Sequence, residues 1–263
     1  MRRTLTVASV AGAVLAAPLA GLAGAADVHV TVLQTGGLHA RGAGMAVQVS
    51  VTCSPGEVGF VDVLASQRVS QTAVYSGSST TPVRCDGSAH RMRVGVVPRD
   101  PNTGSLTGPF KVGPAFVTAT LSVCAGTCAS SRDTRTVDVQ AITLNTPWFV
   151  NPTLAVHLPD RGTVAARGAG AVVRISYRCS TGAAGTFSAT LVQRTPTDTL
   201  ISATAQLGAT CDGRDRTGVL GFHAPGVPWH AGPVFVLLTG SFCGDQGCFD
   251  PRALRTLSLV KPA

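Results

Sequence analysis

The sequence predicts an all-β protein built from two tandem antiparallel β-sandwiches that follow a cleaved leader. Three observations support this class: strand-sized runs in which apolar and polar residues alternate, an internal repeat, and eight cysteines that all follow the leader. No segment shows a sustained helical period. Hydrophobic residues make up 44% and charged residues 13% of the chain, which suits a folded protein and excludes a disordered or collagen-like one.

Residues 1–25 have the features of a secretory signal peptide. Arg2-Arg3 is followed by an apolar stretch over residues 5–17, and Ala23-Gly24-Ala25 supplies small residues for cleavage after Ala25. An uncleaved anchor is the alternative, but Pro18 and several glycines make a poor spanning helix. We therefore expect a secreted, extracellular protein with no transmembrane segment in the mature chain.

An internal repeat divides the remaining chain into two modules. Ala40-Arg41-Gly42-Ala43-Gly44 recurs as residues 166–170, an offset of 126. The same offset relates Cys53 to Cys179 and Cys85-Asp86-Gly87 to Cys211-Asp212-Gly213. After a shortening of seven residues, Gly113-Pro114 matches Gly232-Pro233, Phe116 matches Phe235 and Cys124 matches Cys243. Arg135-Thr136 then matches Arg255-Thr256 at an offset of 120. The sequence predicts β-sandwich modules at 27–144 and 153–261, which fold independently and are joined by a linker at 145–152.

Alternation within the two copies predicts the strands. Val47, Val49 and Val51 fall on one face of a strand that ends at Cys53, and their counterparts in the second copy repeat the pattern. Each module holds about seven such runs, separated by turn-forming residues. This count favours an immunoglobulin-like sandwich in each module, with a small closed barrel as the alternative.

The cysteines predict disulfides rather than a metal site, because they are even in number and lie in an exported chain. Four cysteines per module allow three pairings. The repeat favours bonds between the cysteines that are near in sequence, since three residues lie between the last two cysteines in one copy and four in the other while the flanking strands stay aligned. The predicted bonds are Cys53–Cys85, Cys124–Cys128, Cys179–Cys211 and Cys243–Cys248. An antibody-like bond from Cys53 to Cys124 remains the alternative.

Two resemblances to known families follow from these motifs. Ile175-Ser176-Tyr177-Arg178-Cys179, then Thr210-Cys211-Asp212-Gly213 and an apolar strand opened by Gly-Pro, resembles small secreted actinobacterial proteins with immunoglobulin-like modules and uncharacterised function. Cys124-Ala125-Gly126-Thr127-Cys128 is similar to a short disulfide loop of the enediyne-binding apoproteins of the neocarzinostatin type. Their Gly-Leu-Ser-Asp-Gly opening is absent and the first predicted disulfide spans more residues here, so their ligand is not carried over.

The carboxylates do not form a recognisable catalytic pattern. Glycoside hydrolysis normally needs two carboxylates at the bond, and Glu57, the single glutamate, lies in a predicted exposed turn. Asp86 and Asp212 recur in both modules between Cys and Gly, where an aspartate accepts hydrogen bonds from nearby backbone amides. We interpret both as structural turn residues.

The histidines predict neither a duplicated active site nor a metal site. None of the six has a histidine counterpart in the other module, and no G-x-S-x-G, H-x-H or H-E-x-x-H motif is present: His29, His39, His90, His157, His223 and His230. Ala-Arg-Gly-Ala-Gly lacks the Lys-Ser/Thr of a phosphate loop and precedes a strand, so a bend entering the sheet is predicted. We expect no metal and no cofactor.

Few aromatic residues are available for ligand contact. Aromatics are 5% of the chain, which disfavours the stacking platforms of nucleic-acid binding. Trp229, matched by Phe110, precedes an apolar strand and is predicted to be core. Trp148 and Phe149 lie in the linker, where packing between the modules competes with ligand contact.

These observations favour a non-enzymatic secreted protein that binds or adheres at the cell envelope. The formal net charge of +8 favours anionic envelope polymers as partners and comes from dispersed arginines rather than a basic block. A carrier of a small apolar ligand is the second hypothesis, and a secreted enzyme or enzyme inhibitor is the third.

Overall fold

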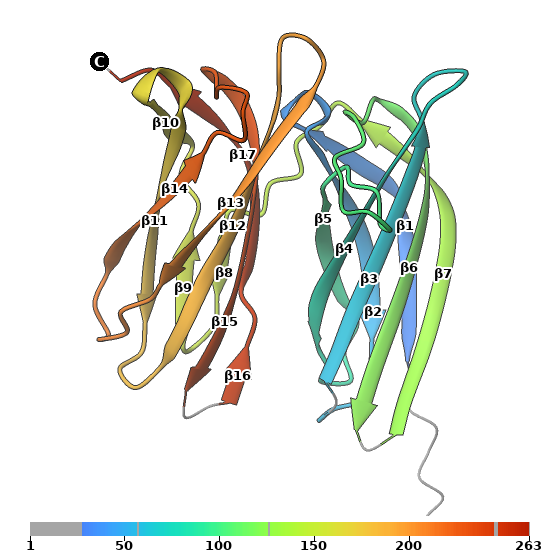
Figure 1. Cartoon of the computed structure of the whole chain (residues 1–263). Coiled ribbons are helices and arrows are strands. Elements are labelled where there is room, and N and C mark those ends of the chain that lie inside the picture. The colour runs from blue at the N-terminus through green and yellow to red at the C-terminus, as the bar shows by residue number, and fades with distance from the viewer. Residues whose placement is uncertain (1–27, 57, 126, 245–246, 263) are drawn as a thin grey trace, which may run out of the picture.

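The computed structural model describes residues 28–56, 58–125, 127–244 and 247–262. The predicted signal peptide, its cleavage site and Glu57 lie outside these ranges. Within the described ranges, no helix has the length and apolar character needed to cross a membrane. The chain is almost entirely β, which confirms the predicted all-β, sandwich-like architecture (Figure 1).

The first repeat forms a seven-stranded sheet in the order β4-β3-β6-β7-β1-β2-β5. Its strands are β1 (His29–His39), β2 (Gly44–Thr52), β3 (Val58–Arg68), β4 (Val74–Arg84), β5 (His90–Val96), β6 (Gly113–Ala125) and β7 (Thr127–Gln140). All neighbours are antiparallel except β1 and β7, which pair in parallel near Gly36. The register of β1 against β2 shifts between Val32 and Gly36, and this shift lets β1 join both layers of the sandwich.

The second repeat forms a ten-stranded sheet in the order β13-β12-β15-β17-β10-β11-β9-β8, with β14 paired to β11 and β16 to β15. Its strands are β8 (Trp148–Val150), β9 (Leu154–His157), β10 (Arg161–Ala165), β11 (Gly170–Cys179), β12 (Ala184–Arg194), β13 (Leu200–Gly208), β14 (Arg216–His223), β15 (Gly232–Gly244), β16 (Gly247–Phe249) and β17 (Arg252–Val260).

Two prolines and the linker explain why the second repeat has more strands than the first. Pro159 separates β9 from β10, and Pro251 separates β16 from β17, because proline has no N–H to donate to a ladder. Each pair corresponds to one continuous strand of the first repeat, β1 or β7. The remaining extra strand, β8, comes from the predicted linker and pairs with β9.

Each repeat has its own apolar core, built from the predicted inward-facing residues. Val47 and Val49 are buried in one core, and Val173 and Ile175 in the other. Trp229 and its counterpart Phe110 are also buried, as predicted. The two cores are separate clusters, so each repeat buries its strands without the other.

The repeated Ala-Arg-Gly-Ala-Gly segment forms a bend before a strand, as predicted. Ala40 to Gly42 form a short 3₁₀ turn in which all three residues have positive φ, and residues 166–168 do the same. The amide of Phe110 donates to the carbonyl of Gly42 at 3.0 Å. A Cβ at Gly42 would lie 2.1 Å from the Phe110 carbonyl oxygen, so this position requires glycine.

A third apolar cluster joins the two repeats. Phe235 on β15 is fully buried against the outer face of β2 and β5. A Cβ at Gly44 would lie 2.3 Å from the Phe235 ring, and a Cβ at Gly95 would lie 3.1 Å from it. Two glycines therefore make the space that the ring occupies. The cluster also contains small and aliphatic side chains from both repeats: Ala40, Ala43, Ala46, Val97, Val192 and Leu254.

Hydrogen bonds cross the same interface. The Arg194 guanidinium donates to the Arg41 carbonyl at 2.8 Å, and Arg99 donates to the Ser202 hydroxyl at 2.9 Å. His39 is fully buried, with its Nδ1 hydrogen-bonded to the Thr256 hydroxyl at 3.0 Å. Its Nε2 is buried without a partner. Burial, with a smaller effect of Arg93, lowers the pKa of His39 from 6.5 to about 4.

The four predicted disulfides are confirmed: Cys53–Cys85, Cys124–Cys128, Cys179–Cys211 and Cys243–Cys248. The antibody-like alternative from Cys53 to Cys124 is wrong. The two longer bonds each close 32 residues and tie the end of one layer to the other, whereas the shorter bonds close the turns between neighbouring strands.

Removing the long disulfide should destabilise the protein more than removing the short one. In the loop-entropy model the Cys53–Cys85 bond contributes about 4 kcal/mol and the Cys124–Cys128 bond about 2 kcal/mol. Denaturant unfolding of the Cys53→Ala/Cys85→Ala and Cys124→Ala/Cys128→Ala variants measures both losses. Equal losses would contradict the entropic explanation.

Residues 153–261 expressed alone should fold, because the second core is complete within them. Circular dichroism should show a cooperative β-sheet melt. The isolated repeat should melt below the whole chain and bind a hydrophobic dye, since Phe235 and Leu254 lose their cover. The Phe235→Ser variant of the isolated repeat should bind less dye, and a disordered product would show that the repeats depend on each other.

Acid should weaken the protein through His39. The unfolded chain takes up a proton near pH 6.5 and the folded chain near 4, so stability is complete above about 6.5 and falls as the pH drops towards 4. The free energy of unfolding falls by about 3 kcal/mol over this pH range. The difference in unfolding free energy between wild type and His39→Gln should change over this window. A constant difference would contradict the buried neutral state.

Candidate binding groove between the two repeats

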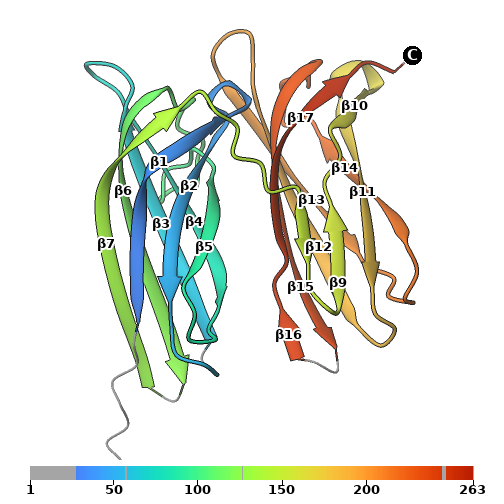
Figure 2. The same cartoon turned by 180° about the vertical axis from the view of Figure 1, so that it is seen from behind.

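Two adjoining hollows of about 530 and 700 Å³ lie between the repeats, and together we call them the inter-repeat groove. Both hollows share Pro82, Phe149 and Asp250 in their walls. The first repeat supplies one wall from β2, β3, β4 and β5, and the second repeat supplies the other from β8, β16 and β17. Figure 2 shows β5 of the first repeat on the side turned toward the second repeat, across from β15 and β16.

One end of the inter-repeat groove is cationic. Arg91, Arg93 and Arg252 contribute three guanidinium groups to its wall, against the single carboxylate of Asp250. None of the three arginines forms a salt bridge within the described residues. Arg93 donates to the carbonyl of Asn145 at 2.7 Å. The wall of this end therefore has a net positive charge.

Arg252 is held in place by neutral oxygen atoms of the first repeat. It donates to the Thr80 carbonyl and to the hydroxyl groups of Thr81 and Ser79. Its Nε is buried without a partner. Burial lowers the pKa of Arg252 from its ordinary value to about 10, so the group is still charged at neutral pH. A buried cation without a carboxylate partner favours an anion nearby.

The other end of the inter-repeat groove carries exposed apolar side chains, beside Arg84, which pairs with Asp86. Val58 and Phe60 point outward from β3, and Val150 points outward from β8 with 70% of its surface exposed. Phe149 lies between the two ends and stacks on Phe249 at 6.3 Å between ring centroids. The groove therefore joins exposed apolar side chains to a cationic wall.

Phe149 and Trp148, the two linker aromatics that the sequence indicates as possible ligand contacts, have different surroundings in the structure. Phe149 packs against the second core and lines both hollows, so it touches the core and the groove together. Trp148 is not part of the groove wall. It is half-exposed and stacks on His157 at 3.9 Å, and burial followed by nearby Arg255 lowers the pKa of that histidine.

Asp86 and Asp212 occupy turns at the disulfide ends, as predicted. Asp86 accepts from the Ser88 amide at 2.9 Å, and Asp212 accepts from the Arg214 amide at 3.1 Å. Hydrogen bonds from His90 and from Arg216, respectively, contribute most to lowering the pKa of these exposed carboxyl groups. Both aspartates are therefore ionised turn residues with local partners.

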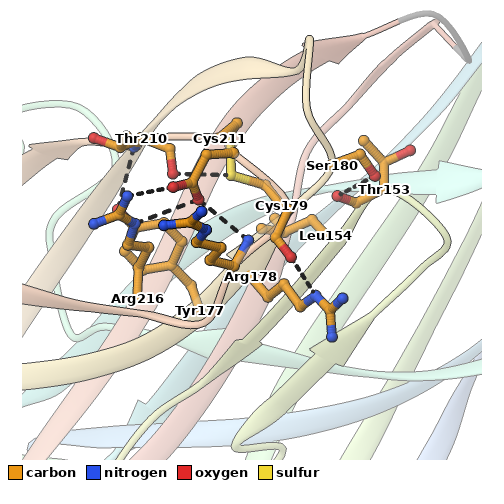
Figure 3. The surroundings of a disulfide bond; sticks show 12 residues. Thr153, Leu154, Tyr177, Arg178, Cys179, Ser180, Thr210, Cys211 and Arg216 are labelled. Atoms are coloured by element: carbon orange, nitrogen blue, oxygen red, sulfur yellow. Dashed lines mark hydrogen bonds and ion pairs between the residues drawn. A yellow bond between two sulfur atoms is a disulfide. The ribbon is translucent and has the colours of Figure 1, made fainter.

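Side chains around the Cys179–Cys211 bond form hydrogen bonds with nearby backbone groups (Figure 3). The Tyr177 hydroxyl accepts from the Thr210 amide at 3.2 Å, and the Arg178 guanidinium donates to the Gly213 carbonyl at 2.8 Å. Figure 3 shows these side chains gathered around the bond. They close the end of the sandwich.

The histidines do not gather in the described part of the chain. His39 is in the inter-repeat interface, His90 pairs with Asp86 at 2.7 Å, and His157 stacks on Trp148. Among the described residues no three potential metal ligands lie together.

Sequence reasoning missed the cationic end of the groove. The arginines at 91, 93 and 252 come from different repeats, and no local motif connects them. The sequence does contain a sign of the apolar end. Phe60 and Leu64 lie on the side of β3 where the alternating pattern predicts polar residues, so this strand carries apolar residues on both faces. Such a two-sided strand indicates an outer face that is covered or functional.

Comparisons with known proteins do not assign the groove. No protein-family model matches the sequence, and no curated protein matches it. Among solved structures, red sea bream transglutaminase is 13% identical over 90% of this chain and 31% of its own, with a TM-score of 0.26. A structure described as pT26-6p is 9% identical over 92% of this chain and 65% of its own, with a TM-score of 0.23.

Proposed function

We propose that this chain is a non-enzymatic protein of the cell exterior that binds an anionic amphiphile of the cell envelope in the inter-repeat groove. One observation carries the proposal: a single groove combines three arginines that form no salt bridge among the described residues with exposed apolar side chains. A negatively charged head group would contact Arg91 and Arg93, and an apolar tail would lie against Val58, Phe60 and Val150.

Location and charge support an envelope ligand. Four disulfides suit an oxidising compartment, and residues 1–25 read as an export signal. Without Arg2 and Arg3 of the predicted leader, the formal net charge falls from +8 to +6, and it attracts anionic surfaces over a distance of about 10 Å at 0.1 M salt. Apolar surface that remains exposed beside charged groups is typical of a ligand site.

Calorimetry with short-chain phosphatidylglycerol, used as a monomer in solution, should show saturable binding. Arg91→Gln/Arg93→Gln should weaken the affinity about tenfold, since each exposed charge pair is worth up to about 1 kcal/mol. Arg161→Gln/Arg214→Gln removes two charges from exposed positions outside the groove and should leave the affinity unchanged.

Phosphatidylcholine with the same acyl chains separates the two ligand classes. Much weaker binding of this neutral head group supports the proposal. Equal binding of both lipids would show a carrier of apolar ligands that does not use the arginine end. No binding of either lipid, or equal weakening by the control variant, would overturn the groove as an anionic amphiphile site.

A further inference from the structure

The interface between the repeats joins two different faces. The first repeat contributes the outer face of β2 and β5, where Gly44, Ala46 and Gly95 leave room; we call this the glycine face. The second repeat contributes the outer face of β12, β15 and β17, where Phe235 and Arg252 project; we call this the phenylalanine face. Such an interface is heterologous, so each repeat also has a face that the contact within the chain does not use.

The second repeat keeps a glycine face of its own. Gly170 and Gly221 correspond to Gly44 and Gly95 in strand pairing, because Gly221 pairs with Val172 as Gly95 pairs with Ala46. A Cβ at Gly221 would meet nothing within 4 Å, and the nearest atom to one at Gly170 is 3.5 Å away. Neither glycine has a positive φ. Within the described chain, nothing requires glycine at either position.

The first repeat keeps a phenylalanine face. Phe116 corresponds to Phe235, since it pairs with Thr136 as Phe235 pairs with Thr256. Phe116 is 58% exposed, whereas Phe235 is buried. An aromatic side chain left in water beside open strands is a candidate anchor for an interface.

Polar groups of the phenylalanine face are also retained. Arg132 pairs with Thr120 as Arg252 pairs with Thr239, so it corresponds to the arginine that reaches across the interface within the chain. Arg68 occupies the position of Arg194 and is exposed. Arg132 has no hydrogen bond or ion pair among the described contacts, so its guanidinium is available to a partner.

The two free faces lie on opposite sides of the molecule. β11 and β14 are at one lateral end and β6 and β7 are at the other (Figure 1). We propose that the glycine face of the second repeat binds the phenylalanine face of the first repeat in another copy of this chain. Phe116 then occupies the space above Gly170 and Gly221, and the contact repeats into an open chain of molecules because it does not close on itself.

The contact between copies is weaker than the contact within one chain. Leu237 and Leu254 of the covered face correspond to Thr118 and Thr134 in the first repeat, so less apolar surface is buried. The intermolecular contact also lacks the covalent linker that holds the repeats together. Assembly therefore depends on concentration, and it strengthens at higher salt because the net positive charge of the mature chain is screened.

Light scattering of the mature chain should show an average mass that rises beyond a dimer between micromolar and millimolar concentration. Phe116→Ser removes the anchor, and Gly221→Val fills the space above the glycine face. Each variant alone should keep the mass of a single chain. Gly208→Val is the matched control for Gly221→Val, since Gly208 is exposed, lies outside β11 and β14, and has nothing within 4 Å of an added Cβ, so this variant should assemble like wild type.

A mixture of the two variants gives the sharpest result. Phe116→Ser keeps an intact glycine face and Gly221→Val keeps an intact phenylalanine face, so an equal mixture should form dimers and nothing larger. A wild-type chain that stays single, a wild-type mass that stops at a dimer, or a mixture that stays monomeric would overturn the proposal. Lipid binding by either variant is measured separately, so failure of the groove proposal remains distinguishable.

Discussion

The placement of Phe235 against two glycines holds the two repeats in one arrangement, and the rest of the molecule depends on it. The ring fills space that a side chain at Gly44 or Gly95 would occupy. Arg91 and Arg93 come from one repeat while Arg252 and Phe149 come from the other. The groove wall is therefore complete only when this contact fixes the repeats side by side.

Features that depend on local chemistry and on the repeat could be predicted from the sequence. Cys124 and Cys128 lie directly opposite each other in a hairpin, so their short spacing determined the bond. The Ala-Arg-Gly-Ala-Gly bend recurs because the third of its three residues with positive φ, Gly42 or Gly168, lies against the backbone of Phe110 or Trp229, where a Cβ does not fit. Two copies of one pattern gave two independent observations of each feature.

Features that depend on packing between the repeats could not be predicted in the same way. Arg252 resembles any other outward-facing strand arginine in the sequence, yet it is buried because the first repeat covers it. Likewise β8 forms from the predicted linker because β9 has a free edge for Trp148–Val150 to pair with. In both cases the deciding contact comes from a segment distant in sequence.

The two repeats differ in the residues that surround the phenylalanine, but both have a phenylalanine at the corresponding position. Leu237 and Leu254 lie under the interface, whereas the corresponding residues are Thr118, which is buried, and Thr134, which is exposed; their hydroxyl groups share a hydrogen bond at 3.2 Å. Threonine keeps the β-branched shape that suits a strand while reducing exposed apolar surface. The phenylalanine was not exchanged in this way at Phe116, although the same solubility argument applies to it. Contact with another surface explains why a large aromatic side chain is kept where its neighbours became polar.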